Sequence, residues 1–407
     1  MKALRTVLTI NKNGRLVYRD YSRSWTKHFM EALYLSHANI TSATPLATIK
    51  DIMGSEVRAA DTEGSHPAVA SELKSNLLAA APAGHAGILL QNGGSGNNDL
   101  AYGRAHWVSG NSFGIMIGRD ATAATPSDYR LIDPIGHGIG ATVAVAASLE
   151  SFTAEDGDVN SQTTNSAVGA IYVPKRTILV TRIDMKCWRT GNPGNVTMRV
   201  GGVKNSAVNQ VSSESTTIGE SDVVNANLWG NATPGAVVTF TFSTPVLMLA
   251  GLPYFCYIYP SQSGAGQYVN IRYKNLGVAQ NGPIKTFVNA AAHPGALSIT
   301  DYHHVYFDIW GTIGAEMEWG GTDFYGFTIA DPNASFSLSR LFRNNSGESI
   351  EVNECGLVVP VMRYFTVTEN YAFNSFMVLA ARDVIAPHID VADGENIEVI
   401  YTPSITV

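Results

Sequence analysis

The chain has 407 residues, and 27 Lys and Arg against 34 Asp and Glu give a formal net charge of −7 at pH 7. Charged residues make up 15% of the chain, where soluble proteins average about 25%, and hydrophobic residues make up 45%. This composition excludes a wholly disordered chain, and the mild acidity leaves no basic field for a nucleic-acid backbone, so we expect no direct DNA or RNA binding.

The three cysteines, Cys187, Cys256 and Cys355, lie far apart and form no C-x-x-C pair. Neither a disulfide framework nor a zinc ribbon is indicated, although one disulfide remains open. Residues 1–10 lack the apolar run of a signal peptide, and the apolar stretches are too short to span a bilayer. We therefore expect a protein made in a cytoplasm, with no membrane span and no cofactor.

The first predicted elements are strands. Residues 4–10 alternate polar and apolar side chains, Asn13-Gly14 follows, and residues 15–18 continue the strand pattern. An Asn-Gly pair between two such runs is typical of a tight β-hairpin. Further along, residues 112–118 form a short apolar run between glycines, which predicts a buried strand.

A helix is predicted after this hairpin. Ser24 precedes Trp25, Phe29 and Leu33, whose spacing of four places them on one face of a helix. Ser24 is the expected N-cap, because its hydroxyl can accept a hydrogen bond from the first turn. The stripe of Trp25, Phe29 and Leu33 is a candidate surface for docking on neighbouring subunits.

The stretch 151–166 is predicted to be a linker, because it is rich in Asp, Asn, Ser and Thr and poor in apolar residues. Within it, Asp156, Asp158 and Asn160 carry oxygen ligands at alternate positions, as calcium loops do. The positions that an EF-hand fills with Gly and Glu hold other residues. A solvated linker is therefore favoured over a calcium site.

Strand patterns dominate the rest of the chain. Between residues 167 and 312 the strand candidates are 170–173, 177–187, 196–200, 236–242, 254–259, 268–273 and 305–310. Turn residues such as Gly191-Asn192-Pro193-Gly194 separate them, which predicts an antiparallel β-sandwich. After residue 312 the candidates are 324–329, 335–342, 349–359, 376–384 and 397–401, and Asn344-Asn345-Ser346-Gly347 predicts a hairpin turn between two of them.

The segment from about 167 to 312 resembles β-sandwich modules of secreted and viral surface proteins, which are similar to carbohydrate-binding jelly rolls. The resemblance is carried by residues 178–188, 191–197, 239–242 and 250–254. It implies a fold that buries one face of each sheet and can present aromatic side chains on the other.

The flanks on either side of this segment resemble the virion structural proteins of tailed bacteriophages. The residues that carry this resemblance are 13–15, 23–25, Phe29, 114–118, 125–129, 345–350, 352–357, 379–384 and 395–399. Cys355 stands where the family pattern has Ile or Val. The resemblance implies other virion structural proteins as partners, a homo-oligomer such as a trimer or a ring, and a location in the virion.

The predicted fold class is mainly β. A β-sandwich or jelly-roll host domain with a short N-terminal helical region is expected from residues 1–150 plus 315–407. A second antiparallel β-sandwich, residues 167–312, interrupts it, and residues 151–166 and 313–314 are the expected linkers. Such an insertion is tolerated where its chain ends lie close together on the surface of the host domain.

Tyrosines crowd one region of the predicted insert. They are Tyr254, Tyr257, Tyr259, Tyr268 and Tyr273. Because side chains alternate along a strand, Tyr257 and Tyr259 share a face opposite Ile258, and this face is a candidate surface for a host glycan or a protein. Packing inside the sandwich is the alternative that base rates favour.

Motifs for metal or phosphate binding are incomplete. Asp301, His303 and His304 precede a strand, but adjacent histidines point to opposite faces and rarely share one metal. The glycine-rich residues 135–140 lack the Lys and Ser/Thr of a phosphate loop, which favours an irregular turn.

No catalytic motif stands out. The carboxylate pairs Asp301 with Asp308 and Glu316 with Glu318 meet no spacing requirement for glycan cleavage, and we expect solvated charges there. The leading hypothesis is a non-enzymatic structural component of a tailed-phage virion that projects its inserted sandwich outward. A glycan-binding adhesin is the alternative, and a polysaccharide-degrading enzyme is the third hypothesis.

Overall fold

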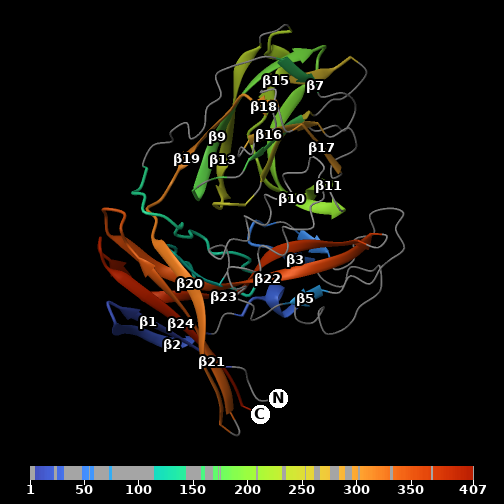
Figure 1. The fold of residues 1–407 in the computed structure, drawn as a ribbon. Helices are drawn as coiled ribbons and strands as arrows, with labels where there is room; N and C mark the ends of the chain where they lie inside the picture. The colour runs from blue at the N-terminus through green and yellow to red at the C-terminus, as the bar shows by residue number, and fades with distance from the viewer. Residues whose placement is uncertain are drawn as a thin grey trace. The chain divides into compact units, whose positions relative to one another are not determined.

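The computed structural model describes residues 5–22, 25–31, 48–54, 56–58, 73–75, 114–143, 157–160, 168–172, 174, 176–207, 210–231, 235–252, 254–260, 266–275, 284–288, 296–300, 303–330, 333–367 and 370–406. These residues form two compact units. Unit 1 holds those of Met1–Leu89, Val108–Thr142 and Gly314–Val407, and unit 2 holds those of Val143–Ile313. Both consist mainly of antiparallel strands, which confirms the predicted mainly-β class (Figure 1).

One sheet of unit 1 joins the two ends of the chain. Its strands are β1 (Arg5–Lys12), β2 (Arg15–Ser22), β20 (Glu318–Ala330), β21 (Asn333–Arg343) and β24 (Asn396–Thr406), in the order β2-β1-β24-β21-β20. The first and last strands pair directly along their length, from the Arg5–Ser404 pair to the Lys12–Ile397 pair.

The hairpin predicted at Asn13-Gly14 is confirmed. Asn13 and Gly14 have positive φ angles of 49° and 75°, as a tight two-residue hairpin turn requires. The backbone N–H of Asn13 also donates to the carbonyl of Asn396 at 3.0 Å. This contact ties the turn to the start of β24.

A second group of strands in unit 1 surrounds one long hairpin. It consists of β22 (Ile350–Val367) and β23 (Asn370–Val391), with β5 (Leu73–Ser75) and β6 (Gly114–Gly118) both paired to β22. The short strands β3 (Thr48–Lys50) and β4 (Glu56–Arg58) pair with each other. The run predicted at 112–118 therefore does contain a buried strand.

The turn at Asn344-Asn345-Ser346-Gly347 corrects one prediction. It connects β21 to β22, which belong to different sheets, so it is not a hairpin turn. The Asn344 side chain is buried and donates to the carbonyls of Glu348 and Val391, each at 2.7 Å. These bonds redirect the chain from one sheet to the other.

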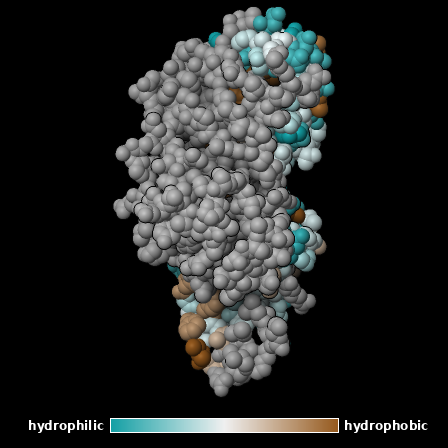
Figure 2. Space-filling model, turned by 90° about the vertical axis from the view of Figure 1, so that its right-hand side faces the viewer, coloured by the Kyte–Doolittle hydropathy of each residue, from teal (hydrophilic) through white to brown (hydrophobic). Residues whose placement is uncertain are grey.

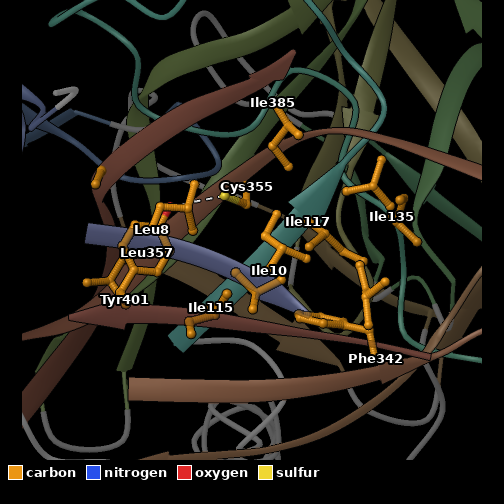
Figure 3. Packing of buried hydrophobic residues seen from close by; sticks show 14 of the residues in the cluster. Leu8, Ile10, Ile115, Ile117, Ile135, Phe342, Cys355, Leu357, Ile385 and Tyr401 are labelled. Carbon is orange, nitrogen blue, oxygen red and sulfur yellow. Dashed lines mark hydrogen bonds between the residues drawn. The ribbon is translucent and has the colours of Figure 1, made fainter. Parts of the chain in front are cut away.

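Side chains from both flanks of the chain share the core of unit 1 (Figure 3). β1 contributes Leu8 and Ile10, and β6 contributes Ile115 and Ile117. The C-terminal strands add Phe342, Cys355, Leu357, Ile385 and Tyr401 to the same cluster. Within it, the Tyr401 hydroxyl donates to Asp383 at 3.0 Å and lies 3.2 Å from the Cys355 sulfur. The flanks thus bury apolar surface together.

The predicted helix begins later than expected. Residues 27–31 are helical, and the backbone N–H of Phe29 donates to the Thr26 hydroxyl at 3.3 Å. Thr26 is therefore the N-cap in place of Ser24, which lies outside the described residues. The Thr26 hydroxyl also donates to the carbonyl of Leu379, so the cap fastens the helix to β23.

A buried ionic network fixes the loop that follows β6, residues 119–133, to the β22–β23 hairpin. Arg382 and Glu354 are both fully buried, and their Nε and Oε2 atoms are 2.6 Å apart. Arg382 also donates to Asp128 at 2.9 Å and to Asp120 at 3.3 Å.

The partner carboxylate closes this network. Glu354 accepts the backbone N–H groups of Ile132 and Asp133 at 3.3 and 3.0 Å. Burial raises the pKa of Glu354, while the hydrogen bond from Arg382 acts in the opposite direction. A Cβ atom at Gly118 would lie 2.3 Å from Glu354 Oε1, so the glycine is needed for the carboxylate to fit.

Unit 2 contains two groups of antiparallel strands. Its elements are β7 (Gly157–Asn160), β8 (Val168–Tyr172), β9 (Ile178–Thr190), β10 (Asn195–Ala207), β11 (Gln210–Glu220), β12 (Val224–Asn225), η1 (Ala226–Leu228), β13 (Ala236–Met248), β14 (Tyr254–Pro260), β15 (Tyr268–Asn275), β16 (Ile284–Val288), β17 (Ala296–Thr300), β18 (His303–Val305) and β19 (Phe307–Thr312). One sheet has the order β11-β17-β16-β8-β14-β10-β12, and the other contains β13-β9-β15-β18 with β19 on β9 and β7 on β15.

The linker predicted at 151–166 is corrected by β7. This strand pairs with β15 from Asn160–Asn270 to Gly157–Tyr273, so part of the polar stretch belongs to a sheet. The other expected linker also carries structure at Ile313, which forms a bridge with Val143. The prediction was wrong because a strand at the edge of a sheet can be as polar as a linker. Composition alone does not tell the two apart.

We expect Arg382→Leu to lower the free energy of unfolding of unit 1 by about 3–5 kcal/mol, because it leaves Glu354 buried without its cation. The exposed Arg343 on β21 provides a matched control. Arg343→Leu should change stability by less than about 0.5 kcal/mol. Chemical denaturation followed by circular dichroism measures both, and equal effects of the two substitutions would contradict the structural role given to Arg382.

Candidate functional site

The described residues of the predicted docking stripe, Trp25 and Phe29, pack against unit 1. The Phe29 side chain is 2% exposed, and its ring stacks on that of Trp25 with centroids 5.2 Å apart. Trp25 also forms a bridge with Ala381 of β23. Leu33 lies outside the described residues. Trp25 and Phe29 are thus used for internal packing, which corrects their assignment as a docking surface.

The predicted tyrosine face exists but is largely covered. On β14, Tyr257 and Tyr259 lie opposite Arg199 and Thr197 of β10, on the other face from Ile258. Tyr257 is fully buried, and its ring stacks on Phe255 at a centroid distance of 4.3 Å. Burial raises the pKa of Tyr257. This residue is therefore not available to a glycan, contrary to the prediction.

The remaining tyrosines have separate roles. Tyr254 is buried, and its hydroxyl accepts the backbone N–H of Leu249 at 2.7 Å, which corrects its assignment to a binding surface. Tyr259 is partly exposed, with the Arg199 guanidinium 3.9 Å from its ring centroid. Tyr268 is also partly exposed, and its hydroxyl accepts the backbone N–H of Gly266. The Tyr273 side chain lies outside the described residues.

A polar cluster that sequence reasoning missed lies on the outer face of β13, β9 and β19. Asp184 is 5% exposed, and it accepts hydrogen bonds from Trp310 Nε1 and Thr239 Oγ1, each at 2.8 Å. Arg182 donates to the same carboxylate and places its guanidinium 4.2 Å from the Trp310 ring centroid. The acceptor atoms of Asp184 are engaged by these donors, so the cluster joins three strands and serves a structural role.

The carboxylates predicted to be solvated are partly buried. Asp308 is 8% exposed and Glu316 is 4% exposed, which corrects the expectation for both. Glu316 accepts the backbone N–H of Gly140, at 3.3 Å, from the glycine-rich loop 135–140. Glu318 accepts a hydrogen bond from the Asn345 side chain. Asp301 lies outside the described residues, as do the side chains of the two adjacent histidines.

The calcium interpretation is also revised. Asp158 and Asn160 lie in the extended strand β7, so they do not form a coordinating loop, and Asp156 lies outside the described residues. In the described part of the chain, one group has metal-ligand spacing: Glu351, His388 and Asp390 on β22 and β23. All three are exposed, and exposed acidic groups of this kind are common without an ion.

The most exposed apolar surface of the described residues lies at the end of the β20–β21 hairpin, residues 322–330 and 333–338, which we call the arm; within it β21 stays paired with β24 as far as the Asn333–Thr406 pair, and β20 is the outer strand. Four large hydrophobic side chains of β20 are exposed on it: Phe324, Tyr325, Phe327 and Ile329. Phe327 and Ile329 expose 72% and 73% of their surface. Figure 2 shows hydrophobic side chains gathered at the lower end of the visible face, at the height of this hairpin in Figure 1.

The arm stands on a well-packed base. Leu338 is 4% exposed and belongs to the core of unit 1, and Phe324 lies opposite it on β20 and stacks on Phe336. Arg340 is buried and donates to the carbonyl of Ile115 at 2.8 Å. Burial lowers the pKa of Arg340 to about 10. The apolar end of the arm is therefore held out by a fixed base.

Both outer strands of this sheet have one open edge among the residues that the structure describes. Within the described residues, β2 pairs only with β1, and β20 pairs only with β21. β2 also exposes apolar side chains, at Leu16, Val17 and Tyr21. An open sheet edge with exposed apolar residues is a template for pairing with another chain, and contiguous apolar patches mark interaction sites.

Comparison of the sequence with models of known protein families and with curated proteins finds no match. Among the described helices, none has the length and apolar character needed to cross a membrane.

We expect the exposed apolar residues of the arm to contribute little to folding. Phe327→Ala should change the free energy of unfolding by less than about 0.5 kcal/mol, because the ring is mostly in water already. Leu338→Ala, in the core below the arm, should cost about 2–5 kcal/mol. Urea unfolding of both variants measures the difference, and a large loss of stability in Phe327→Ala would show that the ring packs within the chain.

Proposed function

We propose that this chain is a non-enzymatic structural subunit of a tailed-bacteriophage virion. Unit 1 binds neighbouring subunits through the arm, and unit 2 projects outward from the assembly. The observation that carries the proposal is the exposed apolar surface of Phe324, Phe327 and Ile329 on a rigidly based hairpin.

The exposure of apolar side chains to water supports this role for the arm, because such exposure is unfavourable unless a partner covers them. Exposed aromatic and aliphatic side chains on an open strand promote unwanted association, and monomeric proteins usually protect such edges with charges, prolines or short strands. In a large assembly, the same side chains stabilise the complex by about 25 cal/mol for each Å² of apolar surface that they bury. The resemblance of the flanking segments to phage virion proteins supports a virion as that assembly.

The test is incorporation into particles. In a phage genome that carries the gene, the double substitution Phe327→Ser with Ile329→Ser should reduce the copies per purified particle by about tenfold or more, because it removes apolar surface from the contact. Leu228→Ser provides a matched control, because Leu228 is 83% exposed but lies in unit 2.

Copies per particle are counted by quantitative mass spectrometry. The control variant should incorporate at the wild-type level. Absence of the wild-type chain from purified particles, or normal incorporation of the double variant, would contradict the proposal.

The alternative function, a glycan-binding adhesin, depends on exposed aromatic rings in unit 2. Tyr259 and Trp310 reach the surface, but each ring carries an arginine guanidinium, 3.9 and 4.2 Å from the ring centroid, where a sugar would stack. Tyr268 is also partly exposed, and its hydroxyl already accepts the backbone N–H of Gly266. We therefore expect the full chain to show no binding on a glycan array. Binding that is lost in Tyr259→Ala or Trp310→Ala, with folding retained, would favour the adhesin.

A further inference from the structure

Residues at the two open edges of the unit 1 sheet lie in the same rows across its strands. One row runs from Arg19 on β2 through Thr9, Ile400 and Ser339 to Asp323 on β20. The next row runs from Tyr21 through Val7, Thr402 and Ser337 to Tyr325, and the hydroxyls of Ser337 and Thr402 are hydrogen-bonded across β21 and β24. Both rows lie on the face opposite Leu8 and Leu338, which point into the core.

The two edges also match in strand direction. Every neighbouring pair in the order β2-β1-β24-β21-β20 is antiparallel. The first and fifth strands of such a sheet run in the same direction. A second copy placed beside the first without a shift along the strands would therefore bring its β2 parallel to β20.

The charged residues at the two ends of the first row, Arg19 and Asp323, are opposite in sign. In this placement Arg19 of one copy lies beside Asp323 of the next, and Tyr21 lies beside Tyr325. All four side chains are exposed in the single chain. A salt bridge beside an aromatic pair is a favourable combination of cross-strand neighbours.

We propose that β20 of one copy pairs with β2 of a second copy, so that the chain forms a head-to-tail homo-oligomer. This inference rests on the proposed function and names the partner of its docking surface. A head-to-tail contact uses two different patches of each copy, and it produces a ring if the rotation closes and a filament if it does not.

The shape of β20 limits the length of this contact. Its pairing with β21 is irregular between Trp319 and Thr322 and again between Tyr325 and Thr328, which leaves four regular residues, Thr322, Asp323, Phe324 and Tyr325. Opposite them, β2 is regular from Tyr18 to Ser22. A short ladder gives a weak single contact, so association depends on protein concentration and on the side-chain rows.

Disulfide trapping tests the pairing in the full chain. Cys187, Cys256 and Cys355 are buried, and burial raises the pKa of each thiol, so they do not compete with engineered surface cysteines. A mixture of Tyr21→Cys and Tyr325→Cys chains should form disulfide-linked dimers on mild oxidation. Each variant alone should form none, and one chain carrying both substitutions should form a ladder of oligomers.

Charge reversal provides the second test, measured by sedimentation velocity over a range of concentrations. Arg19→Glu and Asp323→Arg should each weaken self-association by about tenfold, since each places like charges side by side. The two substitutions together should restore it. Lys27→Glu, which reverses an exposed charge away from both edges, is the matched control, and melting temperatures verify that every variant folds.

Three results would overturn this pairing: no dimers in the mixture, dimers from either cysteine variant alone, or no recovery in the double charge reversal. A chain that is monomeric yet enters particles would contradict the head-to-tail contact and leave the virion role intact. A chain that forms the trapped oligomer yet is absent from particles would contradict the virion role and leave the pairing intact.

Discussion

The pairing of the first strand with the last strand is the constraint on which the rest of unit 1 depends. Because β1 lies between β2 and β24, the N-terminal hairpin adds to the sheet that the C-terminal strands form. This arrangement places Leu8 and Ile10 in one core with Phe342 and Tyr401. It also decides that β2 and β20 become the edges, and so determines which side chains remain open to a partner.

The buried charges give this unit a single geometry. Arg382 and Glu354 hold one another on adjacent long strands, while Asp120, Asp128 and the N–H groups of Ile132 and Asp133 attach the loop to them. Removing either charge would leave the other uncompensated in the interior, so the network opposes alternative packings of the loop. A rigid base of this kind suits an arm whose exposed residues must meet a partner in one orientation.

Sequence patterns predicted local structure more reliably than partners. Asn13-Gly14 identified the first hairpin because its positive φ angles are a local requirement. The turn at 344–347 was recognised as a turn, but its chemistry does not say whether the next strand returns to the same sheet. The alternation at Tyr257 and Tyr259 gave the shared face correctly, yet it does not show what covers that face.

The Asp184–Trp310 and Glu354–Arg382 contacts join residues that are far apart in the chain, so one sequence carries no signal for them. The arm was predicted as strands, but its position at an edge follows only from the sheet order.

Hydrogen–deuterium exchange of the unit 1 sheet tests the central claim most directly. If β1 and β24 form the middle of one sheet, their amides should exchange slowly and with the same apparent free energy of opening, and both should lose protection together when denaturant is added. Alternate amides at the outer edges of β2 and β20 should exchange much faster. Loss of protection in β24 while β1 stays protected, or the reverse, would contradict a shared sheet.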